Sequence, residues 1–232
     1  MRIWVTRSAP EAEATADRLR ARGHAPLVAP VLNLRRTNDS APSLAGVGAV
    51  AFTSRNAVTV FCESSLERAL PVFAVGDATA RAAREAGFQR VASAEGDVEA
   101  LAGLIAARCG EFSGAVLHAG ASEPAGDLAG ALTAAGVPCL QHASYWVEDA
   151  EIPLAAAAAL QARPVELDAI LVHSPRAARR LAAFEPLEKI AHELQVFCIS
   201  PAAAAPLRNL NFAHVAWAPL PNETSLLDLI DR

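Results

Sequence analysis

The sequence predicts an α/β protein of two lobes, each a parallel β-sheet flanked by helices. Short apolar segments of strand length alternate with alanine-rich segments of helical spacing, which is the pattern of βαβ units. This pattern occurs twice, since residues 49–57 return as 169–177, 71–80 as 195–204, and 97–105 as 222–230. The copies lie about 110 to 125 positions apart, the size of one small domain. Two similar lobes predict a ligand cleft between them.

The elements of the first half follow in order. Arg2–Thr6 is a short apolar strand, and Ala9–Arg22 carries apolar and alanine residues at helical spacing until Gly23 ends the helix. Ala25–Leu34 is a long extended segment containing two prolines, and the polar residues Thr37–Pro42 are typical of a linker. Strands and helices then alternate as strand Ala49–Thr53, helix Asn56–Cys62, strand Val72–Val75, helix Ala78–Ala86, strand Arg90–Ala92, helix Val98–Ala107, strand Ala115–His118 and helix Ala125–Ala135.

A second long extended run, Val137–Val147, occupies the place in the repeat that Ala25–Leu34 holds in the first copy, because Ile3–Leu32 is echoed faintly by Ala115–Tyr145. The alternation then resumes as helix Leu154–Ala162, strand Ala169–Val172, helix Ala177–Phe184, strand Val196–Ile199, helix Ala202–Leu207, strand His214–Ala218 and helix Thr224–Ile230.

The two extended runs could be the strands by which the chain leaves one lobe and returns to it. In that case the first lobe is discontinuous and comprises residues 1–35 and 148–232, and the second lobe comprises residues 38–145. The lobes would then be joined by a two-stranded linker. A division into an N-terminal and a C-terminal half fits the repeat as well, and the repeat alone does not decide between the two.

The composition restricts the class of protein. Hydrophobic residues make up 53% of the chain, which is enough for buried cores and argues against disorder. The apolar runs are far shorter than the roughly 20 residues of a membrane span, and the start of the sequence lacks the apolar region of a signal peptide, so we expect a cytoplasmic protein. The net charge of −5 and the lack of a Lys/Arg stripe argue against nucleic acid as a partner.

Several kinds of site are not indicated by the motifs. The four cysteines are scattered, without a C-x-x-C pair or a histidine at ligand spacing, so we expect reduced thiols and no metal site. The glycines at 46 and 48 superficially resemble a dinucleotide fingerprint, but they precede a strand instead of following one. The sequence also lacks a Walker A motif, an H-E-x-x-H motif and a G-x-S-x-G motif.

Polar residues collect where predicted strands end and helices begin. In open parallel sheets ligands bind beyond the carboxyl ends of strands, where helix N-termini present free N–H groups. The residues at these junctions include Thr53, Ser54, Asn56, Gly76, Thr79, Ser174 and Ser200. Each one, taken alone, is also typical of an ordinary helix cap. Taken together in two lobes, they could bind a polyanion without a basic surface.

Four further side chains have alternative roles. His118 and His173 stand at predicted strand ends facing the cleft, where a histidine could be a general acid. Tyr145, the single tyrosine, is either a packed aromatic residue or a hydroxyl donor to a leaving group. Arg7 follows the first strand and is either a cation for a ligand carboxylate or a solvated charge.

Short motifs occur in a fixed order along nearly the whole chain. They are Trp4-Val5-Thr6-Arg7, Phe52-Thr53-Ser54-x-Asn56-Ala57, Ala74-Val75-Gly76-x-x-Thr79-Ala80, Tyr145 at the end of the mid-chain strand, Ser174-Pro175, Cys198-Ile199-x-Pro201 and a terminal Pro-x-x-x-x-Leu-Leu helix. No single motif is specific, but the ordered set resembles the uroporphyrinogen-III synthase family.

The resemblance implies a two-lobed lyase of tetrapyrrole (heme) biosynthesis that converts linear hydroxymethylbilane to cyclic uroporphyrinogen III. The hydroxyl leaves the methylene of ring A, the azafulvene attacks ring D at its substituted carbon, and a spiro intermediate fragments and recloses with ring D inverted. The family implies no metal or organic cofactor. We expect a monomer whose partner is its small-molecule substrate, and a transient handover from the upstream bilane-forming enzyme is compatible with this.

The resemblance also assigns roles to residues of this chain. Tyr145 is expected to assist the departure of hydroxide, and Arg7 to complement the charge of a substrate with eight carboxylates. Carboxylate binding is expected of Thr53, Ser54, Asn56, Gly76, Thr79, Ser174 and Ser200. The bilane is intrinsically reactive, so the protein mainly has to fold it and control which carbon attacks.

Two motifs depart from the family's pattern. The second copy of the repeat has Ser200-Pro201-Ala202-Ala203 where the family shows Gly-Pro-x-Thr, and Val172-His173-Ser174 where it shows Phe-Thr-Ser. These changes keep a different class of function open, namely a non-catalytic two-lobed binding module or a regulatory homologue for a small polyanionic ligand.

Overall fold

The chain divides into two compact units. The computed structural model describes residues 1–9, 11–37, 41–124 and 126–231. Unit 1 consists of Met1–Asn33 and Glu148–Arg232, and unit 2 consists of Leu34–Val147. The unit boundaries fall within β3 (Leu32–Arg36) and β8 (Cys139–Asp149), which are neighbours in one sheet. None of the helices in the described part of the chain has the length and apolar character needed to cross a membrane.

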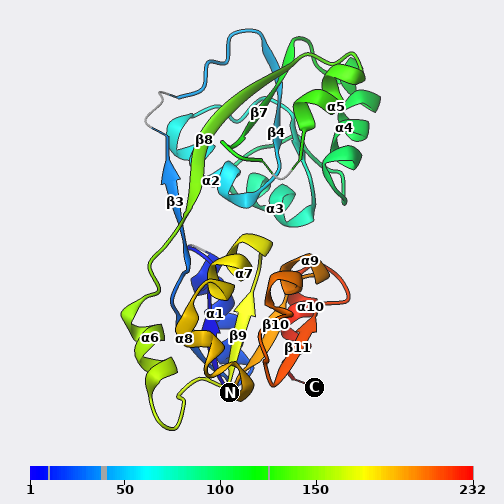
Figure 1. Ribbon diagram of the computed structural model, residues 1–232. Coiled ribbons are helices and arrows are strands. Elements are labelled where there is room, and N and C mark those ends of the chain that lie inside the picture. Colours follow the sequence, from blue (N-terminus) through cyan, green and yellow to red (C-terminus); the bar gives the residue numbers. More distant parts are fainter. Residues whose placement is uncertain (10, 38–40, 125, 232) are drawn as a thin grey trace. The chain divides into compact units, whose positions relative to one another are not determined.

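Unit 1 is built on a five-stranded sheet in which all neighbouring strands are parallel. Its order is β11-β10-β9-β1-β2, formed by β1 (Arg2–Val5), β2 (Ala25–Val28), β9 (Ala169–Val172), β10 (Gln195–Cys198) and β11 (His214–Trp217). Figure 1 labels β9, β10 and β11 of this sheet. The order reverses between β1 and β9, so the carboxyl ends of these two strands form a topological switch point.

Alternate residues of the unit 1 strands are buried against helices on both faces of the sheet. Trp4 and Ile170 belong to one core, whereas Ile3 and Leu171 belong to the other. This explains why the strands are apolar throughout, as expected for a parallel sheet covered on both sides. The first core is completed by α6 (Leu154–Gln161), α7 (Pro175–Ala182), α8 (Glu185–Glu188) and α9 (Pro201–Ala204), and the second by α1 (Glu11–Ala21) and α10 (Glu223–Leu227).

Unit 2 is built on a six-stranded sheet of order β3-β8-β7-β4-β5-β6. Its remaining strands are β4 (Val47–Phe52), β5 (Val72–Ala74), β6 (Val91–Ser93) and β7 (Ala115–Ala121). All neighbours from β8 to β6 are parallel. The order reverses between β4 and β7, which gives unit 2 a switch point of its own.

The unit 2 sheet is also covered on both faces. One core contains Phe52, Phe61 and Phe88, with the ring centroids of Phe52 and Phe61 5.4 Å apart in an edge-to-face arrangement. It is covered by α2 (Arg55–Ser64) and α3 (Asp77–Glu85). The opposite core packs Ala49 and Val116 against α4 (Val98–Ala107) and α5 (Leu128–Ala134), which lie side by side in Figure 1. The predicted α/β class, with parallel sheets flanked by helices, is therefore confirmed.

The sequence repeat corresponds to a repeat of topology. The strand order β6-β5-β4-β7-β8 in unit 2 matches the strand order β11-β10-β9-β1-β2 in unit 1. The segments that repeat in the sequence contain equivalent elements, since β4 corresponds to β9, β5 to β10, and the start of α4 to the start of α10. The strands that open unit 1, β1 and β2, correspond to β7 and β8 late in unit 2. The two units are copies of one sheet whose segments occur in a different order along the chain.

The structure differs from the sequence prediction in several elements. The extended segment Ala25–Leu34 is two strands that belong to different sheets, and Pro30 between them has no N–H to donate to a ladder. The strand predicted at Ala115–His118 continues to Ala121, and α8 was not predicted although Pro186 in its first turn is a helix-start signal. Residue 10 of the first predicted helix, residues 38–40 of the predicted linker and residue 125 at the start of the predicted helix Ala125–Ala135 lie outside the described residues.

Two glycines allow β4 and β7 to pair closely. A Cβ at Gly48 would clash with the backbone carbonyl of Ser113, and one at Gly114 would clash with that of Gly46. Gly114 also has φ +104°, a conformation that other residues rarely adopt. The register of the two strands shifts at this place, between Val47 and Ala49. These backbone positions therefore require glycine.

We predict that Gly48→Ala lowers the free energy of unfolding by about 1–3 kcal/mol, because the methyl group must displace backbone atoms. Gly103→Ala is the matched control, since Gly103 is exposed in α4 and a Cβ there meets nothing within 4 Å. That change should stabilise the protein by about 1 kcal/mol through helix propensity. Urea unfolding of both variants measures the two effects, and equal stability of Gly48→Ala and the wild type would contradict the close approach.

Candidate functional site

A pocket of about 470 Å³ lies at the switch point of unit 2. Its walls come from residues that follow β4, from the start of α4, from the loop after β7 and from β8. This is the place where ligands bind in open parallel sheets. The lining residues are Thr53, Ser54, Val75, Asp97, Val98, Glu99, Ala121, Glu123, Pro124, Gly126 and Tyr145.

Ser54 and Tyr145 form a hydrogen-bonded pair in the wall of this pocket. The Oγ atom of Ser54 lies 2.8 Å from the phenol oxygen of Tyr145, and the backbone N–H of Ala57 donates to the same Oγ at 3.0 Å. Ser54 is therefore the N-cap of α2. The Tyr145 side chain is only 4% exposed and its ring packs in the core of unit 2. The ring is therefore packed, as the first alternative for Tyr145 expected, and the residue also lines the pocket, while donation to a leaving group stays a prediction.

Thr53 and His118 form a second pair beside the first. The Thr53 Oγ1 and His118 Nε2 atoms are 3.3 Å apart, and His118 is buried. Burial lowers the pKa of His118, so the folded protein favours the neutral imidazole. His118 lies inside β7 rather than at the strand end where we expected it, and it is absent from the pocket lining. His173, by contrast, does follow its strand, β9, directly.

The pocket has an acidic wall that the sequence analysis missed. Asp97, Glu99 and Glu123 are three of its lining residues, and none of the lining residues that the structure describes is basic. Asp97 also caps α4, since its Oδ1 accepts the Ala100 N–H at 2.9 Å. Like charges repel, so this wall of the pocket disfavours carboxylate groups of a ligand and favours N–H donors or a cation.

The other predicted residues of unit 2 lie outside this lining. Asn56 is in the first turn of α2, and Gly76 precedes α3, where its carbonyl accepts the N–H groups of Thr79 and Ala80 at 3.0 Å. Thr79 is 5% exposed. Its counterpart in the repeat, Ala203, is fully buried, so the departure from the family's pattern falls at a buried position in both units.

Ser174 and Ser200 are helix caps in unit 1. The Ser174 Oγ accepts from Ala177 N at 3.1 Å, and the Ser200 Oγ accepts from Ala203 N at 3.3 Å. Ser174 corresponds to Ser54 in the repeat and has the same local geometry. A capping hydroxyl accepts one hydrogen bond and keeps its own proton for donation. Each serine could therefore still donate to a ligand oxygen.

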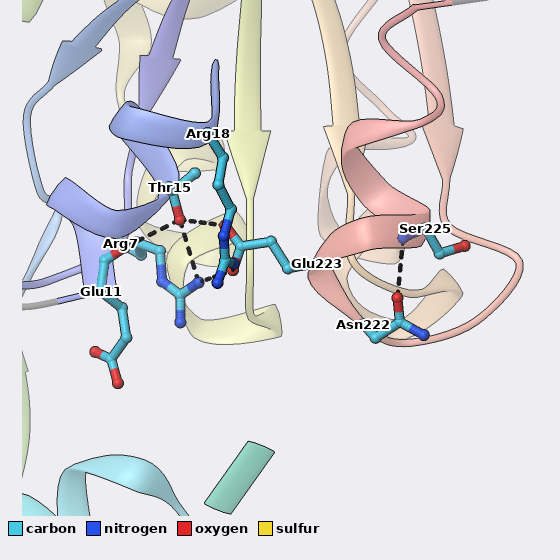
Figure 2. A network of polar contacts seen from close by, with 7 residues as sticks. All are labelled: Arg7, Glu11, Thr15, Arg18, Asn222, Glu223 and Ser225. Carbon is cyan, nitrogen blue, oxygen red and sulfur yellow. Dashed lines mark hydrogen bonds and ion pairs between the residues drawn. The ribbon is translucent and has the colours of Figure 1, made fainter. Parts of the chain in front are cut away.

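Arg7 is part of a polar network within unit 1 (Figure 2). Its guanidinium donates to Glu223 Oε2 at 2.7 Å, and the side chains of both residues are mostly buried, 16% and 13% exposed. Arg18 lies 3.4 Å from the same oxygen, and the Thr15 hydroxyl contacts the other carboxylate oxygen. The charge of Arg7 is thus largely balanced by a carboxylate of the protein itself. Nothing in the sequence around Arg7 indicated a partner 216 positions away.

Two positions distinguish the switch points of the units. The pairing of Ile3 with Ala169 matches that of Val116 with Ala49, so Arg7 in unit 1 corresponds to Gly120 in unit 2. Asn222 caps α10 as Asp97 caps α4, so Glu223 corresponds to Val98. A Cβ at Gly120 would come within 3.2 Å of His118 Nε2. Unit 1 therefore has a mostly buried ion pair where unit 2 has a glycine and a valine.

We predict that His118 makes stability depend on pH. The unfolded chain takes up a proton below the ordinary histidine pKa of about 6.5, whereas the folded chain, with its lowered pKa, resists it. The wild type should therefore lose stability relative to His118→Gln as the pH falls below about 6.5. Urea unfolding at a series of pH values measures the difference. Thr53→Val, which keeps the imidazole buried, should retain the pH dependence, and parallel curves for His118→Gln and the wild type would contradict it.

Among the residues that the structure describes, no group of three or more His, Cys, Asp or Glu side chains could hold a metal ion. Burial raises the pKa of the Cys198 thiol to about 12, so this cysteine is a protonated core residue.

Comparisons with known proteins agree with this architecture. The family model described as uroporphyrinogen-III synthase HemD matches residues 13–228. The uroporphyrinogen-III synthetase of Helicobacter pylori has a similar fold, with a TM-score of 0.65, 18% identity and coverage of 99% of this chain and 97% of that one. A mutant uroporphyrinogen III synthase of the extremely thermophilic bacterium Thermus thermophilus gives a TM-score of 0.56 at 18% identity, covering 100% and 98%.

The sequence matches no curated protein. At 18% identity the two solved structures establish a likeness of fold, while the family model spans most of the chain. By that match, this chain belongs to the uroporphyrinogen-III synthase family.

Proposed function

We propose that this protein converts hydroxymethylbilane to uroporphyrinogen III, with inversion of ring D and loss of water. The observation that carries the proposal is the Tyr145 hydroxyl in the wall of a pocket at a switch point, in a chain of this family. The reaction is a cyclisation with loss of water and no net redox change, so its stoichiometry requires no cofactor. We further propose that the enzyme is cytoplasmic and monomeric.

Tyr145 is the proposed proton donor to the leaving hydroxyl. The C–O bond of the ring A hydroxymethyl group breaks as the Tyr145 proton moves to that oxygen, which leaves as water, and the pyrrole becomes a cationic azafulvene. Ring D then attacks, and the proton that is lost on closure restores the phenol. General acids of this kind contribute about 10²–10⁴-fold to rate.

The acidic wall of the pocket suits this intermediate. Asp97, Glu99 and Glu123 would stabilise a cationic azafulvene and accept hydrogen bonds from pyrrole N–H groups. They would also repel the substrate's carboxylates, which we therefore propose to bind at the other junctions. The candidates at those junctions are the hydroxyl and N–H groups of Asn56, Gly76, Thr79, Ser174 and Ser200, with Arg7 as a weaker candidate because Glu223 already balances its charge. Thr53 and Ser54, the other two expected carboxylate contacts, line the acidic pocket itself and are less suited to that role.

We predict that the protein, supplied with enzymatically generated hydroxymethylbilane, forms the type III isomer in excess of spontaneous closure. The product is oxidised and the type I and type III porphyrins are separated chromatographically. Because spontaneous closure gives type I, a mixture containing only type I would overturn the proposed reaction.

We predict that Tyr145→Phe lowers kcat by about 10²-fold, because the variant keeps the packed ring and loses the proton donor. Urea unfolding of the variant should show a change of no more than about 1–1.5 kcal/mol, the contribution of one hydrogen bond. If the variant keeps the kcat of the wild type, Tyr145 contributes to packing and not to catalysis.

A non-catalytic binding module or regulatory homologue for a small polyanionic ligand is the second candidate. Ala203 favours it, because the hydroxyl of the family's Gly-Pro-x-Thr turn is missing in unit 1. That function predicts tight binding of the bilane or of uroporphyrinogen with no acceleration of ring closure. The isomer assay, combined with a direct binding measurement, distinguishes the two functions.

A further inference from the structure

We propose that Ser54 is a positioning residue that acts through Tyr145. Its hydroxyl donates a hydrogen bond to the phenol oxygen of Tyr145 and so couples the phenol to the N-terminus of α2. The catalytic consequence of this inference rests on the proposed function, whereas the coupling of Ser54 to Tyr145 rests on the distances between their side chains. It gives Ser54 a role other than binding a substrate carboxylate.

The donors and acceptors around the Ser54 hydroxyl support this role. A serine hydroxyl has one proton and two lone pairs, and the Ala57 N–H occupies one lone pair at 3.0 Å. The 2.8 Å bond to Tyr145 can run in either direction. When Ser54 donates, the phenol keeps its own proton for a group in the pocket. When Tyr145 donates, its proton is directed at Ser54 and not at the substrate.

The transfer step favours donation by Ser54. As Tyr145 passes its proton to the leaving hydroxyl, negative charge develops on the phenol oxygen, and a hydrogen bond to a charged group is stronger than one to a neutral group. The Ser54 proton stays on Ser54 throughout, so the only bonds that change are the phenol O–H and the C–O bond of the substrate. Ser54 lowers the cost of the phenolate without becoming an acid or a base.

The N-terminus of α2 adds to this effect. This helix has ten residues, and its first N–H groups carry partial positive charge toward Ser54. The Ala57 N–H polarises the Ser54 hydroxyl, which in turn is a better donor to Tyr145. Tyr145 is buried, and its phenol oxygen is connected to the helix through the Ser54 Oγ atom.

The charged residues that the structure describes in the pocket lining are all acidic and disfavour a phenolate, which such a donor would stabilise. Asp97 and Glu99 come from α4 and Glu123 from the loop after β7, and all three oppose a second negative charge in the pocket. His118 on β7 contacts Thr53, and burial favours its neutral form. Without Ser54, the phenolate would face three carboxylates with one fewer stabilising hydrogen bond.

The single tyrosine makes the coupling directly measurable. Ultraviolet absorbance of the phenolate, followed against pH under native conditions, reports Tyr145 alone. In Ser54→Ala we expect the phenol to ionise about one pH unit higher than in the wild type, the effect of losing one hydrogen bond to an anion. Ser54→Thr keeps both the cap and the donor and should ionise near the wild-type midpoint.

Asp127→Ala is the matched control for loss of a helix cap. Asp127 caps α5 in the same unit, with Oδ1 accepting Gly130 N at 2.8 Å. This variant should leave the phenol midpoint where it is or lower it, because it removes a negative charge. Should Ser54→Ala unfold at alkaline pH, Ser54→Gly replaces it, since glycine caps helices almost as well as serine. An unchanged midpoint in these hydroxyl-free variants would overturn the coupling.

Kinetics test the catalytic consequence. We expect Ser54→Ala to lower kcat about tenfold with KM nearly unchanged, and Ser54→Thr to restore kcat. In a Tyr145→Phe background, Ser54→Ala should have no further effect on kcat, because the two residues act as one unit. A raised KM with unchanged kcat would instead identify Ser54 as a carboxylate contact. If the wild type forms no type III isomer, the proposed function fails, while the phenol titration still decides the coupling.

Discussion

The parallel pairing of β4 with β7 is the constraint on which the candidate site depends. Gly48 and Gly114 allow the backbones at the start of this pairing to approach closely, and the paired strands then end at the same edge of the sheet. Because the strand order reverses here, the helices that follow the strands leave room above that edge. The pocket occupies this edge, and the Thr53–His118 and Ser54–Tyr145 pairs connect its strands.

The two units share a topology and differ in the chemistry of their switch points. Arg7 and Glu223 form a mostly buried ion pair in unit 1, whereas Gly120 and Val98 hold the corresponding positions in unit 2. Val98 lines the unit 2 pocket together with carboxylates, whereas the ion pair connects the residue after the first strand of unit 1 to the start of its last helix. A few side chains on a common scaffold therefore give the two switch points different charge and polarity, and sites on recurrent folds generally differ in this way.

The features of the site that could be predicted are those that depend on residues close together in the sequence. Ser54, Ser174 and Ser200 precede helices in the sequence, and each caps its helix in the structure. Tyr145 was singled out as the one tyrosine of the sequence, and the resemblance then assigned it a catalytic role. The acidic wall was missed because Asp97 and Glu99 looked like an ordinary helix start, and Glu123 lies in a loop without a motif.

By itself, the sequence determined the succession of strands and helices, the two-fold repeat and the helix caps, because periodicity and capping depend on residues within a few positions of one another. Only the tertiary structure decided which polar groups meet. Ser54 and Tyr145 are 91 positions apart, and Arg7 and Glu223 are 216 apart. These contacts exist because strand order and register bring distant segments together. Strand order and register cannot be predicted from the local pattern of residues.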